Sequence, residues 1–131
     1  MPFILLVTAL IKRRNKLLIL QRSKRSKVNK EKWQFPEGKV KYSENLIEAL
    51  RREIKEETNF ELIKARLYGV HLGFLKIGYG KIRILRILFE CKVKGKLKLS
   101  KEHQNFLWVS PNDLEKFDFV KSFSFKDVIT I

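Results

Sequence analysis

Residues 38–60 read GKVKYSENLIEALRREIKEETNF and contain the most strongly predicted helix of the chain. Apolar residues recur here at helical spacing, which predicts an amphipathic helix over residues 44–58. Ser43 is the expected N-cap, because a serine side chain can accept a hydrogen bond from a free backbone N–H of the first turn. Asn59 is expected to end the helix in the left-handed conformation, which asparagine tolerates better than most residues other than glycine.

The last turns of this helix place carboxylates where apolar side chains are expected. At 100° per residue, Glu53 and Glu57 lie at roughly 180° and 220° from Glu44, on the border of the apolar arc and inside it. Glu56 flanks them at roughly 120°. Like charges four residues apart and the negative end of the helix dipole both oppose this arrangement. A divalent cation would reverse these penalties, and carboxylate oxygens suit Mg²⁺ or Mn²⁺, so the stretch predicts a metal site.

Arg52 lies between Glu48 and Glu56 on one side of the same helix, and we expect it to hold Glu56 in one rotamer. The competing interpretation is a surface helix rich in Glu and Lys with scattered ion pairs, which composition alone favours. The inward direction of Glu57 and the turn that precedes the helix favour the metal site.

The flanking sequence predicts strands on both sides of the helix. Phe3–Ile11 and Lys16–Gln21 are apolar runs joined by four polar residues, a pattern typical of a hairpin. Residues 22–32 carry six basic side chains and little to bury, which indicates a loop. Later strands are expected at Leu62–Leu72, Lys81–Lys98 and Phe106–Val109, with a turn at Gly78-Tyr79-Gly80 and a second helix opening at Ser110-Pro111. This order of elements predicts an α/β (α+β) fold, a mixed sheet flanked by helices.

Composition restricts the class of protein and its surroundings. A chain of 131 residues with 44% hydrophobic residues fits one domain with a real core and argues against disorder. Its formal net charge of +15 attracts polyanions such as nucleotides; the alternative is a surface adapted for solubility or heat tolerance. The lone Cys91 excludes an intramolecular disulfide and a Cys-based metal site, and it predicts a reducing, cytoplasmic location. Phe3–Ile11 is too short to span a membrane, so no membrane partner is expected.

The helix and the turn before it resemble a known family signature. The Nudix box is Gly-x5-Glu-x7-Arg-Glu-U-x-Glu-Glu-x-Gly-U, where U is apolar, and the matching residues are Gly38, Glu44, Arg52, Glu53, Ile54, Glu56, Glu57 and Phe60. Asn59 replaces the final glycine. Outside the box, residues 33–36 (Trp-Gln-Phe-Pro) and 108–111 (Trp-Val-Ser-Pro) are similar to segments of MutT-like members. The chain therefore resembles the Nudix hydrolases, MutT-like, over most of its length.

This resemblance implies a fold, a reaction and a set of site residues. The fold is a Nudix-type α/β/α sandwich around a mixed β-sheet, in a single domain over residues 1–131. The reaction is attack of water on a phosphorus atom of a nucleoside diphosphate derivative, with Mg²⁺ (or Mn²⁺) as cofactor. The resemblance assigns metal binding to Gly38, Glu53, Glu56, Glu57 and Glu102, and catalysis to Arg52 together with these four glutamates. Either a glutamate of the box or Glu102 would orient or deprotonate the water.

The substrate is less closely defined by the sequence. Arg22, Lys24 and Arg25 of the basic loop are expected to bind substrate phosphates, and three aromatic residues are available for base stacking: Phe35, Phe74 and Tyr79. Nucleoside triphosphates, dinucleoside polyphosphates, an RNA 5′ end and ADP-ribose all remain open, as do a monomer and a homodimer. A basic nucleic-acid-binding module without activity is the alternative from another class; it would predict a broken box, but Glu53 and Glu57 are both present.

Overall fold

The computed structural model describes residues 3–131; Met1 and Pro2, which the predicted domain includes, lie outside the described residues. The strands are β1 (Phe3–Arg13), β2 (Lys16–Arg22), β3 (Trp33–Gln34), β4 (Glu37–Lys39), β5 (Glu61–Ile77), β6 (Gly80–Lys94), β7 (His103–Val109) and β8 (Ile129–Thr130). The α-helix is α1 (Leu46–Thr58), and two 3-10 helices follow, η1 (Pro111–Lys116) and η2 (Phe125–Asp127).

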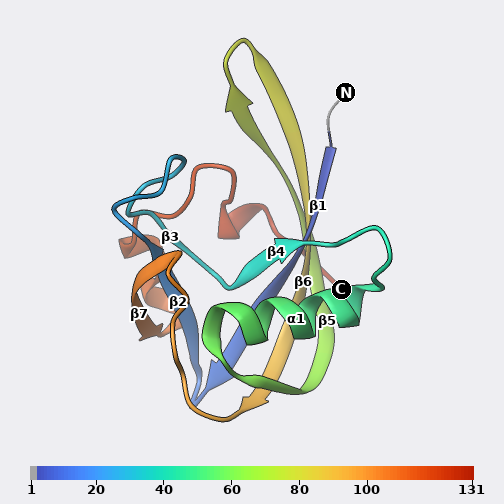
Figure 1. The fold of residues 1–131 in the computed structure, drawn as a ribbon, viewed down its shortest axis with the longest axis vertical. Helices are drawn as coiled ribbons and strands as arrows, with labels where there is room; N and C mark the ends of the chain where they lie inside the picture. The colour runs from blue at the N-terminus through green and yellow to red at the C-terminus, as the bar shows by residue number, and fades with distance from the viewer. Residues whose placement is uncertain (1–2) are drawn as a thin grey trace.

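The predicted hairpin of β1 and β2 is confirmed, and its turn residues Arg14 and Asn15 both have positive φ, at 51° and 64°. The two strands pair only next to this turn and then separate. β1 continues beside β4 and β6, whereas β2 continues beside β3 and β7. Figure 1 shows these two branches diverging from the hairpin turn. The cleft of the candidate functional site lies between them.

The sheet is mixed, as predicted. β1 and β6 run parallel in continuous register from Phe3 opposite Arg83 to Ile11 opposite Cys91, while the other strand pairs are antiparallel. The β5–β6 hairpin turns at the predicted glycines and projects beyond the rest of the sheet (Figure 1). The predicted strand to Lys98 is too long, because β6 ends at Lys94, before Gly95 with φ of 106°.

Helix α1 begins two residues later than predicted. Asn45, rather than Ser43, is the N-cap, and its side chain accepts a hydrogen bond from the N–H of Glu48 while the Glu48 carboxylate accepts one from Asn45. The choice of Ser43 was therefore wrong, because the capping box favours the Asn–Glu pair three residues apart. Asn59 does end the helix in the left-handed conformation, with φ of 67°, as expected.

The two faces of the sheet are covered differently. Helix α1 buries Ala49, Leu50 and Ile54 against one face, where the core also contains Val7 and Phe89. The other face is covered by η1, η2 and the aromatic residues around them rather than by a second α-helix. The predicted second helix is thus a 3-10 helix of six residues, and the Ser110 side chain makes no capping bond to it. No helix within residues 3–131 is both long enough and apolar enough to cross a membrane.

Candidate active site

The C-terminal half of α1 lies against the β4 turn, and this contact brings the central residues of the box together. Gly38 lies so close to Glu53 that a Cβ on Gly38 would overlap the Glu53 carboxylate. Glu57 is 6% exposed, and its Oε1 accepts a hydrogen bond of 3.1 Å from the backbone N–H of Glu37. Glu57 therefore points inward, as its position on the helical wheel predicts.

The charges in this region are poorly compensated. Burial raises the pKa of Glu53, with a smaller upward contribution from Glu56 and Glu102, although Arg52 opposes the rise. Burial raises the pKa of Glu57 well above its usual range, and the negative charge of Glu53 raises it further. Both pKa shifts show that added positive charge would stabilise the ionised carboxylates. Carboxylates together with the Gly38 carbonyl are the oxygen donors that a hard divalent cation takes, so the residues fit such an ion.

Arg52 orders the approach to this cluster. Its guanidinium donates to both carboxylate oxygens of Glu44, at 2.6 and 2.8 Å, and to the carbonyl of Lys39 at 2.9 Å. It also donates to Glu53 at 2.6 Å and to Glu56 at 3.3 Å, so the predicted contact with Glu56 is present. The hydrogen bond from Arg52 lowers the pKa of Glu44 to about 2. Glu44 therefore acts as an ionic link between the loop before α1 and the helix itself.

Glu56 and Glu102 stand further from the cluster. The Glu56 side chain is 56% exposed and paired with Arg52, and Glu102 is exposed just before β7. Within residues 3–131, no group of three or more acidic, His or Cys side chains is already converged on one point. Glu102 nevertheless belongs to the same cleft as Glu57, and its charge raises the pKa of both Glu53 and Glu57.

A cleft of about 270 Å³ opens between the two branches of the sheet. Gly38 and Glu57 line it from the β4 and α1 side, Glu102 lines it from the β7 side, and Arg22 and Arg86 contribute cationic groups. The arrangement combines acceptors for a divalent cation with donors for an anion. Such a combination suits a phosphate compound bound through a metal.

Comparison with known proteins identifies the cleft. Residues 3–126 match the family model described as the NUDIX domain. The chain belongs to the Nudix family. It is 33% identical over 119 residues to the 8-oxo-dGTP diphosphatase of Buchnera aphidicola subsp. Schizaphis graminum, covering 91% of this chain and 86% of the relative.

Structural similarity agrees with this assignment. The crystal structure of the MutT protein from Methanosarcina mazei Go1 aligns with a TM-score of 0.77 at 31% identity, over 93% of this chain and 87% of that one. The nucleoside triphosphatase NudI of Escherichia coli is 29% identical over 94 residues, covering 66% of this chain and 67% of the relative. The chain is thus a MutT-like Nudix hydrolase, an enzyme that acts on phosphoric anhydride linkages of nucleotides, and the non-enzymatic alternative is wrong. Nudix hydrolases generally need a divalent metal.

The floor of the Nudix cleft contains an ion pair that the sequence did not predict. Arg86 is 2% exposed on β6 and donates to both carboxylate oxygens of Glu37, at 2.8 and 3.1 Å. Thr8 also donates to Glu37, and Arg86 donates to the carbonyl and the hydroxyl of Ser122. The sequence offered one signal of a buried charge: Arg86 is the single charged residue within the apolar run 84–89. Its partner Glu37 could be found only from the fold.

Of the three predicted phosphate-binding residues, Arg22 lines the cleft, whereas Lys24 and Arg25 lie outside it. Arg22 lines the cleft, although two of its nitrogens are engaged with the Val28 carbonyl and the Gln34 side chain. Lys24 and Arg25 are exposed and do not line it.

The three predicted stacking aromatics are not gathered around the cleft. The prediction that Phe35 stacks on a base is wrong. Phe35 is 2% exposed and packs against Phe119, so it offers no face to an incoming base. Tyr79 is fully exposed at the tip of the projecting hairpin, away from the cleft. Phe74 lies on β5 with Lys81 and Arg83 over its ring.

A basic groove of about 950 Å³ adjoins the cleft and shares Val28, Asn29, Leu75 and Ser122 with it. The lysines that line this groove are Lys27, Lys30, Lys32, Lys76 and Lys121. Lys32 pairs with Asp118, whereas the other four make no ion pair with any residue in the described range 3–131. The sequence showed these lysines only as scattered charge, since they come from the 22–32 loop, β5 and the segment before η2.

Proposed function

We propose that this enzyme hydrolyses nucleoside triphosphates and related nucleotides with Mg²⁺ or Mn²⁺ held by Glu53, Glu56, Glu57 and the Gly38 carbonyl. The observation that carries the proposal is that Gly38 brings the Glu53 carboxylate against the β4 turn, where the buried Glu57 also bonds to the backbone. A bound metal would neutralise charge on the phosphoryl oxygens and lower the pKa of the attacking water.

Each protein group has a distinct part in this proposal. The Glu37 N–H fixes Glu57, and Arg52 fixes Glu53, so both carboxylates are oriented before substrate arrives. The exposed Glu56 turns from Arg52 toward the cleft on binding. Glu102, which faces the same cleft from the β7 side, orients the attacking water or accepts its proton. Arg22 contributes positive charge toward the phosphate oxygens.

Substitution of the buried glutamates tests the proposal. Glu53→Gln and Glu57→Gln are each expected to lower kcat by about 10² to 10⁴, the range typical of a group that acts in proton transfer or charge stabilisation. Phosphate release with Mg²⁺ measures the effect, and circular dichroism checks the fold. Glu61→Gln is the matched control, because Glu61 is exposed on β5, pairs with Lys94 and does not line the cleft. Full activity in both cleft variants would refute the assignment.

The oxidised guanine nucleotide named for the Buchnera relative and the nucleoside triphosphates named for NudI are the first substrates to examine. The basic groove supports a second class, substrates with additional phosphates such as dinucleoside polyphosphates or a triphosphorylated RNA 5′ end. ADP-ribose, with only two phosphates, would leave the groove lysines unused. Values of kcat/KM across this panel would separate the classes.

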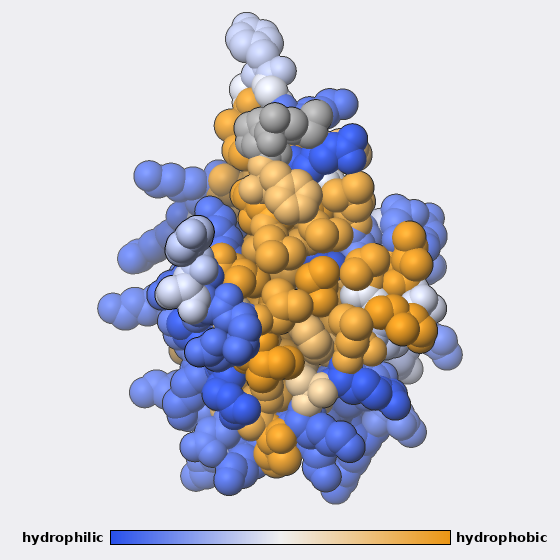
Figure 2. Space-filling view, turned by 90° about the vertical axis from the view of Figure 1, so that its right-hand side faces the viewer, coloured by the Kyte–Doolittle hydropathy of each residue, from blue (hydrophilic) through white to orange (hydrophobic). Residues whose placement is uncertain are grey.

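The setting of the enzyme completes the proposal. We place it in the cytoplasm as one domain, in keeping with the single, buried and unpaired Cys91. A homodimer is favoured over a monomer, because β5 and β8 expose Leu67 and Ile129 by 43% and 69% outside the basic groove. Figure 2 shows an apolar stripe between hydrophilic borders on one side of the molecule. Light scattering at two protein concentrations distinguishes the two states.

A further inference from the structure

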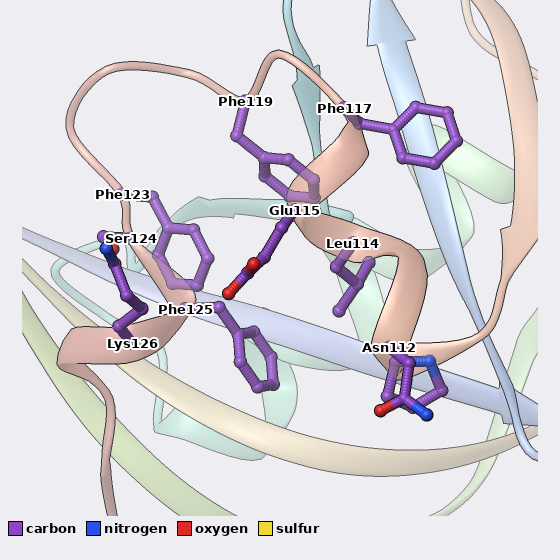
Figure 3. Close-up of a pocket in the computed structure, with 10 residues that line it drawn as sticks. Asn112, Leu114, Glu115, Phe117, Phe119, Phe123, Ser124, Phe125 and Lys126 are labelled. Atoms are coloured by element: carbon purple, nitrogen blue, oxygen red, sulfur yellow. The ribbon is translucent and has the colours of Figure 1, made fainter.

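A second cavity lies on the face of the sheet opposite α1, under the segment from η1 to η2. It measures about 630 Å³, within the range of roughly 300–1,000 Å³ typical of small-molecule sites. Its walls are formed by Leu114 and the rings of Phe119, Phe123 and Phe125, while the Phe117 ring is turned away from these three and packs against Trp33 (Figure 3). None of the residues proposed to bind metal lines it, so it is separate from the catalytic cleft.

The aromatic walls are held from behind and remain accessible in front. Phe35, 2% exposed, packs against Phe119, Phe123 and Phe125 with ring centroids 5.4, 5.8 and 6.1 Å apart. The three wall rings are only partly buried. A supported wall of partly accessible phenyl rings suits a flat aromatic ligand, which can stack without displacing the core.

The polar groups of the cavity restrict the ligand further. Figure 3 shows the Glu115 side chain extending between the phenyl rings, with Asn112 at one rim and Ser124 and Lys126 at the opposite rim. Glu115 makes no ion pair or hydrogen bond with any residue in the described range 3–131. The adjacent Lys116 pairs with Asp113 instead. An ionised carboxylate only accepts hydrogen bonds, so a ligand that enters between the rings must present N–H or O–H donors to it.

Net charge decides between the two ligand classes that aromatic rings and a carboxylate can bind. An organic cation would meet a protein with a formal net charge of +15, which repels it at long range. A nucleotide is attracted by the same field, and a guanine base presents neighbouring N–H donors, N1–H and the 2-amino group, to a carboxylate.

We infer that this cavity is a second nucleotide site, which binds a guanine base between the phenyl rings. Glu115 accepts hydrogen bonds from the guanine edge, and the phosphate lies toward Lys126. The site is independent of metal and of the proposed catalytic residues.

Amide chemical shifts of the whole enzyme, titrated with GMP in the presence of EDTA, test this inference. Saturable shifts concentrated at residues 112–119, which line neither the cleft nor the groove, are expected, with weaker binding of IMP, which lacks the 2-amino group, and weakest binding of AMP, which also lacks N1–H. Shifts confined to residues around the cleft, such as Gly38 and Glu57, would overturn the proposal.

A single substitution then tests the role of the carboxylate. Glu115→Gln should weaken GMP binding at residues 112–119 by at least about tenfold, the effect of losing a hydrogen bond to a charged group, and should leave AMP binding nearly unchanged. Because Glu115 is exposed, the substitution should leave the fold intact. The amide spectrum of the variant without nucleotide checks this. Glu61→Gln is the matched control and should bind GMP like the parent enzyme. Equal GMP affinity in Glu115→Gln and the parent would exclude the proposed contact.

Discussion

Gly38 carries no side chain, and the carboxylate of Glu53 occupies the space that a Cβ would fill. One missing methyl group thereby allows a loop and a helix to bring a backbone carbonyl and a carboxylate together. His71 is a second residue whose surroundings define its chemistry. It is 3% exposed on β5, and its Nε2 accepts a hydrogen bond of 3.1 Å from the N–H of Ser124.

Replacement of Gly38 tests the close approach. Gly38→Ala is expected to displace Glu53 and to lower kcat/KM by about 10²-fold, because small displacements of a catalytic group cost rate steeply. The assay is metal-dependent phosphate release. Gly80→Ala is the control, since a Cβ there would meet the nearest atom, the Ile77 carbonyl oxygen, at an ordinary 3.6 Å. Equal losses in both variants would contradict the explanation.

The stability of the protein should depend on the protonation of His71. Burial lowers the pKa of His71 below its usual value of 6.5, and the positive charge of Arg86 lowers it further. The unfolded chain therefore takes up this proton at a higher pH than the folded one. The stability due to neutral His71 is present above pH 6.5 and is lost as the pH falls through the folded-state pKa.

Urea unfolding of the parent and of His71→Gln across that window measures the contribution. The variant should lose less unfolding free energy than the parent as the pH falls from 7 toward 5. Parallel curves for the two proteins would show that another group dominates.

Helix α1 illustrates what an element requires beyond its periodicity. Its apolar stripe could be assigned from spacing, but its first turn depends on the reciprocal bonds of Asn45 and Glu48. Glu44, which the sequence placed inside the helix, lies before it and bonds to Arg52 instead. The loop and helix are therefore joined by an ion pair that helical geometry alone does not contain.

Two alanine variants distinguish the observed cap from the predicted one. Asn45→Ala should lower the free energy of unfolding by about 1 kcal/mol, within the usual 0.5–2 kcal/mol for loss of an N-cap. Ser43→Ala should change it by less than about 0.5 kcal/mol, as expected for an exposed site. Urea denaturation at pH 7 measures both, and the reverse order would restore Ser43 as the cap.

Across the whole molecule, positive charge is distributed unevenly with respect to the cleft. Four lysines of the adjoining groove have no ion-pair partner in the described range 3–131. Outside the groove, ion pairs join Lys12 to Glu90, Lys94 to Glu61 and Lys116 to Asp113. The groove therefore places unpaired positive charge next to the cleft, where it can act on a polyanionic substrate.

A charge-matched pair of variants measures this effect. The double variant Lys30→Gln/Lys76→Gln should raise KM for a dinucleoside polyphosphate by roughly twofold to thirtyfold, from about 0.2–1 kcal/mol for each exposed contact. The parent KM should rise with added salt, and more steeply than that of the variant. Lys64→Gln/Lys92→Gln removes the same charge at a surface remote from the cleft and should leave KM unchanged. Equal effects in both double variants would mean that net charge alone matters.

Features that depend on neighbours along the chain could be predicted from the sequence. The β1–β2 hairpin, the apolar stripe of α1, the inward direction of Glu57 and the left-handed Asn59 all follow from spacing within one segment, because helix and strand periodicity fix which face a side chain occupies. Contacts between distant segments could be seen only in the tertiary structure. Arg86 pairs with Glu37, 49 positions away in the sequence, and Phe35 packs against Phe119 near the C-terminus. Strand register and loop packing set these contacts, and both depend on long-range pairing that no local pattern encodes.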